Sequence, residues 1–333
     1  MIAVTLYYRE DCPECDQVRK DLSLLQAEIP HNLVAIDIKS DPVLSVSFGD
    51  SVPVVEVGPY HLRPPISLAD LSVALKAASD RQEHLEKTGG QAYKAQKSRG
   101  NRVTRFDRFS YWFSKHYLAV INSIMFIYIG LTFVAPILMK LGETKGARII
   151  YLIYSPLCHQ FAFRSWFLFG EQAFYPRALV NIAGYQTYEQ ISGSAQVDLL
   201  IARAFVGNDF VGYKVALCQR DIAEYLAILL FGILFAITQR RFKPLKWYLW
   251  IIFGIIPIGL DGASQIPSLA QNLFPSWMII RESTPLLRTI TGGLFGFLTA
   301  WFMFPLIDIA MNETQVFLAK KLAAINQKTR PAT

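Results

Sequence analysis

Charged residues and cysteines are both scarce in this chain of 333 residues. Lys, Arg, Asp and Glu together make up 18% of the sequence, whereas hydrophobic residues make up 52%. Soluble domains carry about 25% charged residues, so the composition argues against a wholly soluble protein. The four cysteines form two separate pairs, Cys12 with Cys15 and Cys158 with Cys218, and are too few for a disulfide-rich scaffold. We therefore expect an integral membrane protein with room for more than one domain.

Several common sequence signatures are also missing. The chain shows no nucleotide-binding glycine loop, no Ser/His/Asp pattern of a hydrolase and no heptad repeat. Met1–Tyr8 leads directly into a strand-like pattern, so no secretory signal is predicted. The net charge of +7 comes largely from a linker and from short loops beside apolar segments. This placement predicts contact with the lipid bilayer and no binding of nucleic acid.

Four segments are apolar and long enough to cross a bilayer. A helix of about 20 residues spans the hydrocarbon layer, which is about 30 Å thick. The segments are Leu118–Met139, Leu217–Gln239, Trp247–Ile266 and Ile290–Ile309. They predict an all-α polytopic membrane domain of about four transmembrane helices, over residues 117–312.

Basic residues predict the orientation, because basic loops beside spans stay mainly in the cytoplasm. The basic residues that follow the second segment are Arg240, Arg241, Lys243 and Lys246. Cys218, at the other end of that segment, is therefore expected on the outer side. Ile149–Gly170 would reverse the pattern if it crossed, and it contains Pro156, His159 and Arg164. We expect it to pack at the outer face or to enter and return, with both termini cytoplasmic and the protein in the plasma (inner) membrane.

The first 80 residues alternate strand-like and helix-like patterns. Strands are expected at Ala3–Tyr8, Leu33–Ile38 and Val52–Val57, and helices from the CPEC motif to Gln26 and from Ser67 to Ala78. The CPEC motif begins the first helix. A thiolate at a helix N-terminus is stabilised by unpaired N–H groups, so Cys12 is the expected nucleophile and Cys15 the thiol that resolves a mixed disulfide.

These features resemble a glutaredoxin-like domain with the α/β thioredoxin-like fold, over residues 1–80. The resemblance implies that Pro53 is a cis-proline beside the cysteines and that the partner is a protein thiol or a small thiol. Two departures favour a dithiol reductase over a strong oxidant or a glutathione enzyme. The chain reads GPYHLRPP where glutaredoxins carry a double glycine, and the site is acidic, with Glu10, Asp11, Glu14 and Asp16. A metal-binding CxxC and an inactive docking module are the alternatives.

Two further segments connect these domains and end the chain. Residues 81–116 form a basic linker, part of which could lie as a helix at the headgroups or remain a solvated connector. Residues 313–333 are expected to be a cytoplasmic tail. The aromatic residues that would mark an interfacial helix in the linker are Phe106, Phe109, Tyr111, Trp112 and Phe113.

The expected topology gathers many polar residues at the outer face. Ionisable groups near hydrocarbon are costly unless they are paired, so such a group predicts a functional site, with a salt-bridged anchor as the alternative. The residues are Cys158, His159, Gln160, Arg164, Cys218, Arg220, Asp221, Asp261, Gln265, Arg281, Glu282 and Arg288.

Three motifs within this group resemble an uncharacterised integral membrane family, domain of unknown function 2085. They are CHQFAFRS from Cys158, CQRD from Cys218 and PIGLDGASQ from Pro257 to Gln265. The resemblance covers roughly residues 150–310. It implies a fold and a site but no reaction.

Three chemistries fit the outer group. Cys158 and Cys218 could form a disulfide on an oxidising face, within reach of each other. Zinc could be bound by Cys158, His159, Cys218 and Asp261, although adjacent Cys158 and His159 would chelate one ion only with strain. Alternatively, guanidinium groups could bind a phosphate, a carboxylate or a lipid headgroup.

The sequence thus supports two hypotheses of function. The first is a membrane-anchored thiol–disulfide oxidoreductase whose cytosolic CxxC domain is coupled to the outer site. Because about 30 Å of hydrocarbon separates the two cysteine pairs, a relay between them would need a quinone, a mobile segment or a separate carrier. The second is a transporter or binding protein for an anionic small molecule or lipid headgroup, with the CxxC domain as a redox sensor.

Overall fold

The chain divides into two compact units. In a computed structural model, residues 2–100, 102–194, 197–269, 275 and 280–329 are described. The first unit comprises Met1–His116 with Ile309–Thr333, and we call it the redox unit. The second comprises Tyr117–Asp308, and we call it the membrane unit. Helices α5 and α13 contribute residues to both.

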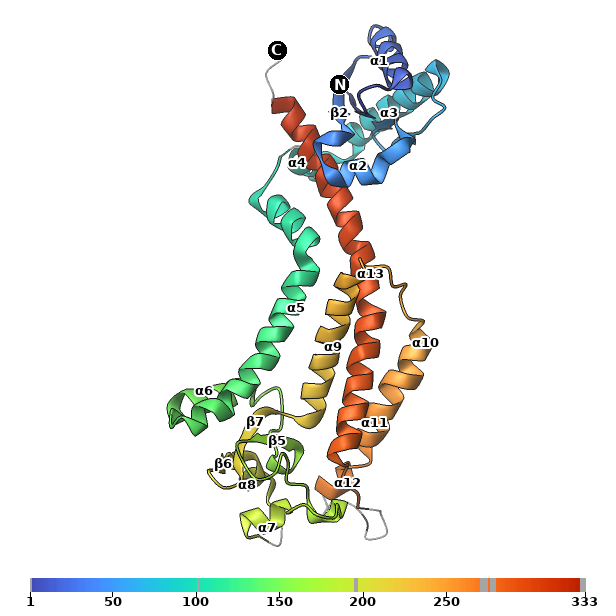
Figure 1. The fold of residues 1–333 in the computed structure, drawn as a ribbon. Helices are drawn as coiled ribbons and strands as arrows, with labels where there is room; N and C mark the ends of the chain where they lie inside the picture. The colour runs from blue at the N-terminus through green and yellow to red at the C-terminus, as the bar shows by residue number, and fades with distance from the viewer. Residues whose placement is uncertain (1, 101, 195–196, 270–274, 276–279, 330–333) are drawn as a thin grey trace. The chain divides into compact units, whose positions relative to one another are not determined.

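The redox unit is built on a four-stranded sheet of order β2-β1-β3-β4 (Figure 1). The strands β1 and β2 are parallel, and β3 is antiparallel to both β1 and β4. The strands are β1 Ile2–Tyr8, β2 His31–Asp37, β3 Val54–Val57 and β4 Tyr60–Leu62. The helices are α1 Pro13–Leu25, η1 Ile38–Ser40, α2 Pro42–Phe48, η2 Gly49–Ser51, α3 Leu68–Thr88 and α4 Gly90–Gly100.

Alternation of apolar residues explains this sheet. Val4 and Leu6 of β1 are fully buried, and they pack with Leu22 of α1 and Leu71 of α3 in one hydrophobic core. Helix α3 begins at a capping box in which the Ser67 hydroxyl accepts the Asp70 N–H group, at 3.2 Å. The expected thioredoxin-like α/β domain is confirmed. The strand β4 and the short helix α2 are additions that the sequence patterns did not indicate.

The end of α13 (Pro285–Thr329) and the start of α5 (Arg105–Lys140) complete the redox unit. Ala319 is 1% exposed, in the same hydrophobic cluster as Cys12 and Cys15. Lys320 Nζ lies 2.6 Å from Glu56 Oε1, and the Tyr111 hydroxyl donates to Asp41 Oδ2 at 2.6 Å. Part of the expected linker and tail is therefore helical and packed against the sheet domain.

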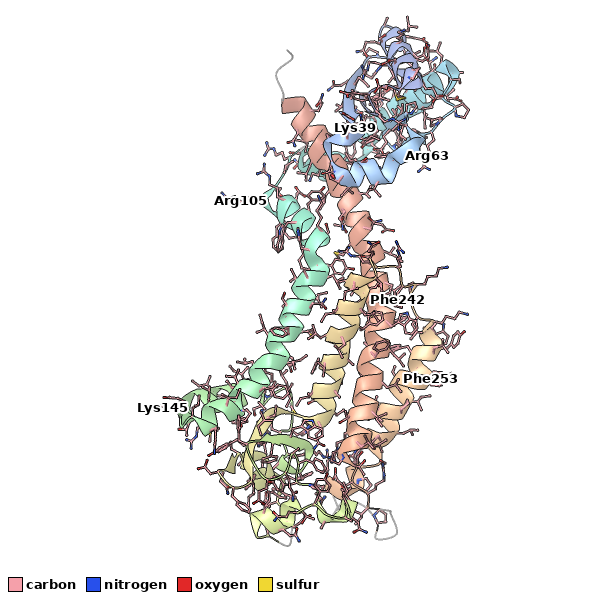
Figure 2. All side chains as sticks on the ribbon, viewed as in Figure 1. Lys39, Arg63, Arg105, Lys145, Phe242 and Phe253 are labelled. Carbon is pink, nitrogen blue, oxygen red and sulfur yellow. A yellow bond between two sulfur atoms is a disulfide. The ribbon has the colours of Figure 1, made fainter. Side chains whose placement is uncertain are left out.

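The membrane unit is mostly helical, and in the part of the chain that the structure describes three helices are long and apolar enough to cross a membrane. They are Arg105–Lys140, Trp247–Leu269 and Pro285–Gln327. The second contains α10 Trp247–Trp250, a π-helical turn at Ile251–Ile255 (η5), α11 Ile256–Ala263 and α12 Ile266–Leu269. Phe253 in the π-helical turn is 53% exposed, as suits a lipid-facing side chain (Figure 2).

The helix α9 (Gln219–Ile237) is the fourth segment that we expected to cross. It has 19 residues, but its first six include three charged residues, Arg220, Asp221 and Glu224. Its charged first turns distinguish α9 from the three helices named above. Of the four spans that we expected, three are supported by helix length and composition. That α9 also crosses the membrane stays a prediction.

The segment Ile149–Gly170 is not a continuous helix. Its first part belongs to α6 (Thr144–Tyr154), which has 11 residues and is too short to cross. A turn, the 3₁₀ helix η3 (Ala162–Arg164) and the strand β5 (Ser165–Leu168) follow. The structure thus agrees with a segment that does not span.

The expectation of an all-α membrane domain was incomplete, because this unit also contains a small antiparallel sheet of order β5-β7-β6. Its longest strand, β7 (Gly212–Cys218), is buried along almost its whole length. Leu217 and Cys218, which we expected at the start of a spanning helix, end this strand instead. The remaining elements are η4 Ala178–Val180, α7 Tyr188–Ser192, α8 Leu199–Ala204 and β6 Gly207–Asn208. The sheet and these short helices gather at one end of α9 (Figure 1).

Candidate functional site

The first candidate site is the cysteine pair at the start of α1. Cys12 and Cys15 form a disulfide, with Cα atoms 5.2 Å apart. Cys12 is the N-cap residue of α1, and its Sγ accepts the backbone N–H of Cys15 at 3.1 Å. Cys12 is 9% exposed and Cys15 is 1% exposed. The geometry makes Cys12 the more accessible sulfur and gives it a hydrogen-bond donor that would also stabilise a thiolate.

The surroundings of this pair agree with the sequence-based expectation. The Val52–Pro53 peptide bond is cis. Glu10, Asp11, Glu14 and Asp16 are all exposed, so water screens their repulsion of a thiolate on Cys12.

The second candidate site lies in the membrane unit, at the N-terminus of α9. Cys158, Cys218 and Asp221 each offer a ligand atom, and these three atoms lie within 4.8 Å of one another. Both cysteines are free thiols. Cys158 Sγ accepts the backbone N–H of Cys218, the N-cap residue of α9, at 3.3 Å. Each cysteine pair therefore places a sulfur at the N-terminus of a helix.

The environment of Cys158 favours the neutral thiol when no cation is bound. Its hydrogen bond with Cys218, its burial and the negative charge of Asp221 all raise the pKa of Cys158. Lys214, 1% exposed, is held by the carbonyl oxygens of Gln160 (2.9 Å) and Arg203, and burial lowers its pKa to about 7. The hydrogen bond with Cys218 is the main cause of the Cys158 shift, and burial is the main cause of the Lys214 shift.

The carboxylate of Glu282 is the centre of a buried charge network. It is 1% exposed and is paired with Arg288 and with Arg164 at 2.8 Å, while Arg177 lies 3.7 Å away. Ser268 Oγ also donates to Glu282 Oε2, at 3.0 Å. These groups come from distant parts of the chain, so the network ties several elements together.

A second carboxylate, Asp261 of α11, has a similar role. It pairs with Arg220 and with Arg281, the latter at 3.2 Å, and it accepts the Ser283 hydroxyl at 3.0 Å. Gln265 Nε2 donates to the Asp261 carbonyl at 2.7 Å. Asp261 and Glu282 together therefore pair with five arginines. One of these, Arg177, also lies 3.7 Å from a third carboxylate, that of Glu189.

A cavity of about 340 Å³ joins the cysteines to this network. Three arginines and one carboxylate line it, namely Arg164, Arg220, Arg288 and Asp221, together with Cys158, Cys218, His159, Gln160 and Gln265. Among the described residues, neither Arg220 Nε nor Arg288 Nε has a hydrogen-bond partner, although both atoms are buried. Basic residues therefore outnumber acidic ones in the lining of the cavity.

The structure brings together most of the residues predicted for this site, but neither His159 nor Asp261 belongs to the ligand group beside the cysteines. His159 is exposed and stacks near Phe161, with ring centroids 5.4 Å apart. Asp261 is held by arginines. We predicted His159 and Asp261 as zinc ligands together with the two cysteines. In the structure, Asp221 is the residue whose carboxylate lies beside the two sulfur atoms. Gln160 positions the loop, because its Nε2 donates to the carbonyls of Tyr151 (2.9 Å) and Ala216 (3.0 Å).

Three buried polar residues were missed, namely Arg177, Lys214 and Ser268. Lys214 carried a signal, since it interrupts the apolar run of β7, where an ionisable residue needs a partner. No sequence pattern singled out Arg177 or Ser268.

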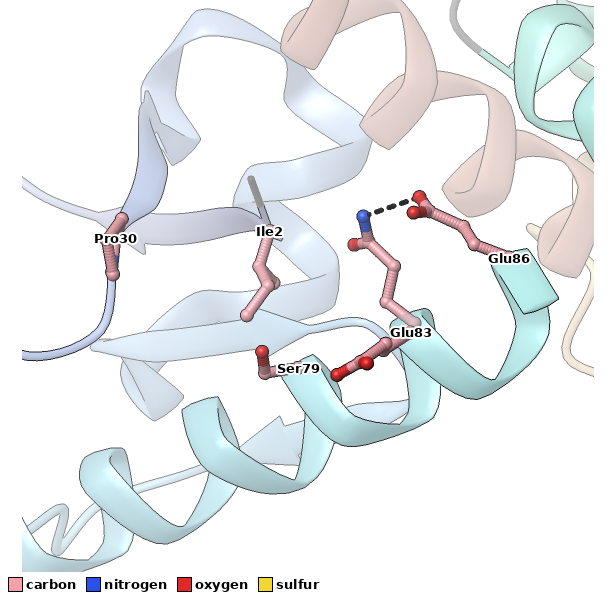
Figure 3. A pocket seen from close by; sticks show the side chains of 6 residues that line it. Ile2, Pro30, Ser79, Glu83 and Glu86 are labelled. Carbon is pink, nitrogen blue, oxygen red and sulfur yellow. Dashed lines mark hydrogen bonds between the residues drawn. The ribbon is translucent and has the colours of Figure 1, made fainter.

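A separate hollow of about 240 Å³ on the redox unit has no such chemistry (Figure 3). Its polar lining groups belong to α3 and are mostly paired within that helix, as Gln82 donates to Glu86 at 2.9 Å and Glu83 pairs with Lys87 at 2.5 Å. We therefore assign it no function.

Comparisons with known proteins agree with this division. Residues 3–76 match the family model of the glutaredoxin-like domain (DUF836), and residues 203–302 match the family model of a predicted membrane protein (DUF2085). The CHQFAFRS run lies before the second match. No solved structure matches the chain significantly.

One similar protein is Uncharacterized protein MJ1492 of Methanocaldococcus jannaschii. It is 28% identical over 200 residues, which are 58% of this chain and 92% of that protein. Together with the apolar helices, the matches show that the chain joins a glutaredoxin-like domain to a membrane domain of the DUF2085 type and is a membrane-associated, redox-like protein.

Proposed function

We propose that the redox unit is a dithiol–disulfide oxidoreductase that works as a reductase on the cytoplasmic side of the plasma membrane. The observation that carries this proposal is the position of Cys12, whose sulfur caps α1, accepts the Cys15 N–H and is already joined to Cys15. The partner is a disulfide of a protein or of a small thiol.

The reaction balances as a two-electron exchange. The Cys12 thiolate attacks the partner disulfide, and one partner thiolate leaves. The Cys15 thiol then loses its proton and attacks Cys12 Sγ, which releases the second partner thiol and leaves the Cys12–Cys15 disulfide. A cellular dithiol or low-molecular-weight thiol restores the reduced pair.

The experiment uses full-length protein in detergent with Cys158→Ser and Cys218→Ser, so that only the CxxC thiols react. After reduction and removal of reductant, the protein is mixed with the aromatic disulfide 5,5′-dithiobis(2-nitrobenzoate). With both CxxC cysteines present, we expect two thionitrobenzoate ions per chain and no bound label. With Cys15→Ser, we expect one ion released and one label retained on Cys12, as seen by mass spectrometry.

The matched control is Cys12→Ser, which leaves only the 1% exposed Cys15. Its reaction should be much slower than that of Cys15→Ser, because the remaining sulfur is less accessible. Equal rates for the two single variants, or a stable label on the protein that keeps both cysteines, would contradict the proposed roles.

A second candidate function concerns the membrane unit, for which we propose binding of a small oxyanion or an anionic lipid headgroup. The supporting observation is the cavity in which Arg164, Arg220 and Arg288 meet one carboxylate. Guanidinium groups bind phosphate and carboxylate oxygens through paired N–H donors.

Replacing Arg220 by lysine tests this candidate. Lysine keeps the charge but loses the planar pair of donors, so we expect binding of inorganic phosphate to weaken about tenfold, which is about 1.4 kcal/mol. The measurement is the shift in melting temperature on phosphate titration, with Arg148→Lys on the exposed face of α6 as the control. Stabilisation by anionic lipid nanodiscs but not by phosphate would identify a headgroup, and no response to either would reject the candidate.

A further inference from the structure

We propose that Cys158, Cys218 and Asp221 form a metal site in the membrane unit that takes a zinc ion through three protein ligands. The fourth coordination position opens to the arginine-lined cavity. This inference goes beyond the thiol chemistry of the redox unit and does not depend on it.

The three ligand atoms come from two parts of the chain, the loop after α6 and the junction of β7 with α9. Cys158 follows α6, Cys218 ends β7, and Asp221 is the third residue of α9. Their atoms lie within 4.8 Å of one another. Tetrahedral zinc with bonds of about 2.0–2.3 Å holds its ligand atoms about 3.3–3.8 Å apart, so only a small contraction around an ion is needed.

The charges of the group explain why a cation belongs there. Two thiols and a carboxylate meet in a partly buried site, and Asp221 has no ion-pair partner within 4.0 Å among the residues that the structure describes. The adjacent Arg220 is turned to Asp261 instead. A divalent cation would allow all three groups to carry negative charge together.

The surrounding structure holds the ligands in place. The Cys218 N–H donates to Cys158 Sγ, a contact that a thiolate ligand accepts more strongly than a thiol. Gln160 ties the loop after Cys158 to Ala216 of β7, and β7 itself is buried. A site built on fixed elements loses little conformational entropy when the ion enters.

The donor set selects the metal. Two thiolates favour zinc over magnesium or calcium, which prefer only oxygen ligands. Because the cavity lies against all three residues, one face of the ion would remain open to water or to an anion. Three protein ligands with one open position are typical of zinc sites that activate or bind a fourth ligand. A simple disulfide would leave Asp221 without a role.

The test is metal analysis of full-length protein purified in detergent under reducing conditions. We expect about one zinc per chain, retained in the Cys12→Ser/Cys15→Ser variant and lost in Cys158→Ser and Cys218→Ser. Asp221→Asn should weaken zinc binding at least about tenfold, in competition with a chelator. Cobalt should replace zinc and give thiolate charge-transfer and tetrahedral visible bands that disappear with Cys158→Ser.

Folding of each variant is checked by size-exclusion chromatography and circular dichroism, so that loss of metal is separated from loss of structure. Zinc that disappears with Cys12 and Cys15 instead would place the ion at the CxxC motif and overturn the proposal. A Cys158–Cys218 disulfide in the absence of added oxidant, or no metal in folded protein reconstituted with zinc or cobalt, would also overturn it.

Discussion

Replacing Glu282 with glutamine is expected to destabilise the membrane unit by about 3–5 kcal/mol, the usual cost of removing one partner of a buried ion pair. The carboxylate is 1% exposed and faces Arg164, Arg177 and Arg288. Glutamine has a similar shape but no charge, so three guanidinium groups would remain near one another without their shared counter-ion. Their mutual repulsion, in a site with little water, adds to the lost attraction.

The measurement is the free energy of unfolding in detergent micelles, together with the melting temperature. Glu171→Gln is the control, because Glu171 belongs to the same unit but is exposed, and its replacement should change stability by less than about 0.5 kcal/mol. If the Glu282 and Glu171 variants were equally stable, Glu282 would not be the counter-ion on which the arginines depend.

Replacing Gly296 with alanine should be the most disruptive change to the packing of α13 on α9. A Cβ atom at Gly296 would lie 2.1 Å from the backbone oxygen of Glu224, and one at Gly292 would lie 2.5 Å from the backbone oxygen of Arg220. Backbone atoms cannot turn aside as side chains do, so the two helices would have to separate. We expect a loss of about 3 kcal/mol, the upper end of the usual cost of overpacking.

Gly293→Ala is the matched control, because it is the same substitution in the same stretch of helix. Its Cβ would meet its nearest atom, the Ala223 backbone oxygen, at 3.9 Å, which is ordinary contact. Alanine also favours helix over glycine by about 1 kcal/mol, so this variant should be neutral or slightly more stable. Thermal unfolding in detergent of both variants decides the matter, and equal losses at the two positions would mean that close helix contact is not the cause.

Local patterns predicted the redox unit well, because short-range signals dominate there. The strand-like pattern marked β1, and Ser67 marked the start of α3. The CxxC pair fell at a helix N-terminus as expected. The docking of Ala319 near the end of the chain was not predicted, since it depends on contact between segments about 300 residues apart.

The membrane unit was predicted less completely, for physical reasons. A short, mostly apolar stretch such as β7 can be a buried strand or part of a helix, and periodicity alone does not separate them. Which carboxylate lies beside the two cysteines depends on the direction in which the side chains of the first turn of α9 point. Composition could not show that Arg220 turns to Asp261 while Asp221 joins the sulfurs.

The helices of the membrane unit are also fastened at the end away from the cavity. There Asp308 of α13 accepts the Tyr117 hydroxyl at 2.7 Å and pairs with Arg240 at 3.0 Å, while the Arg240 guanidinium stacks over the Tyr117 ring. A carrier that exposes its cargo alternately to two compartments must rock its helices against each other. Here such rocking would have to break polar ties at both ends of the same bundle. For the second candidate function, these ties favour a binding protein over a transporter.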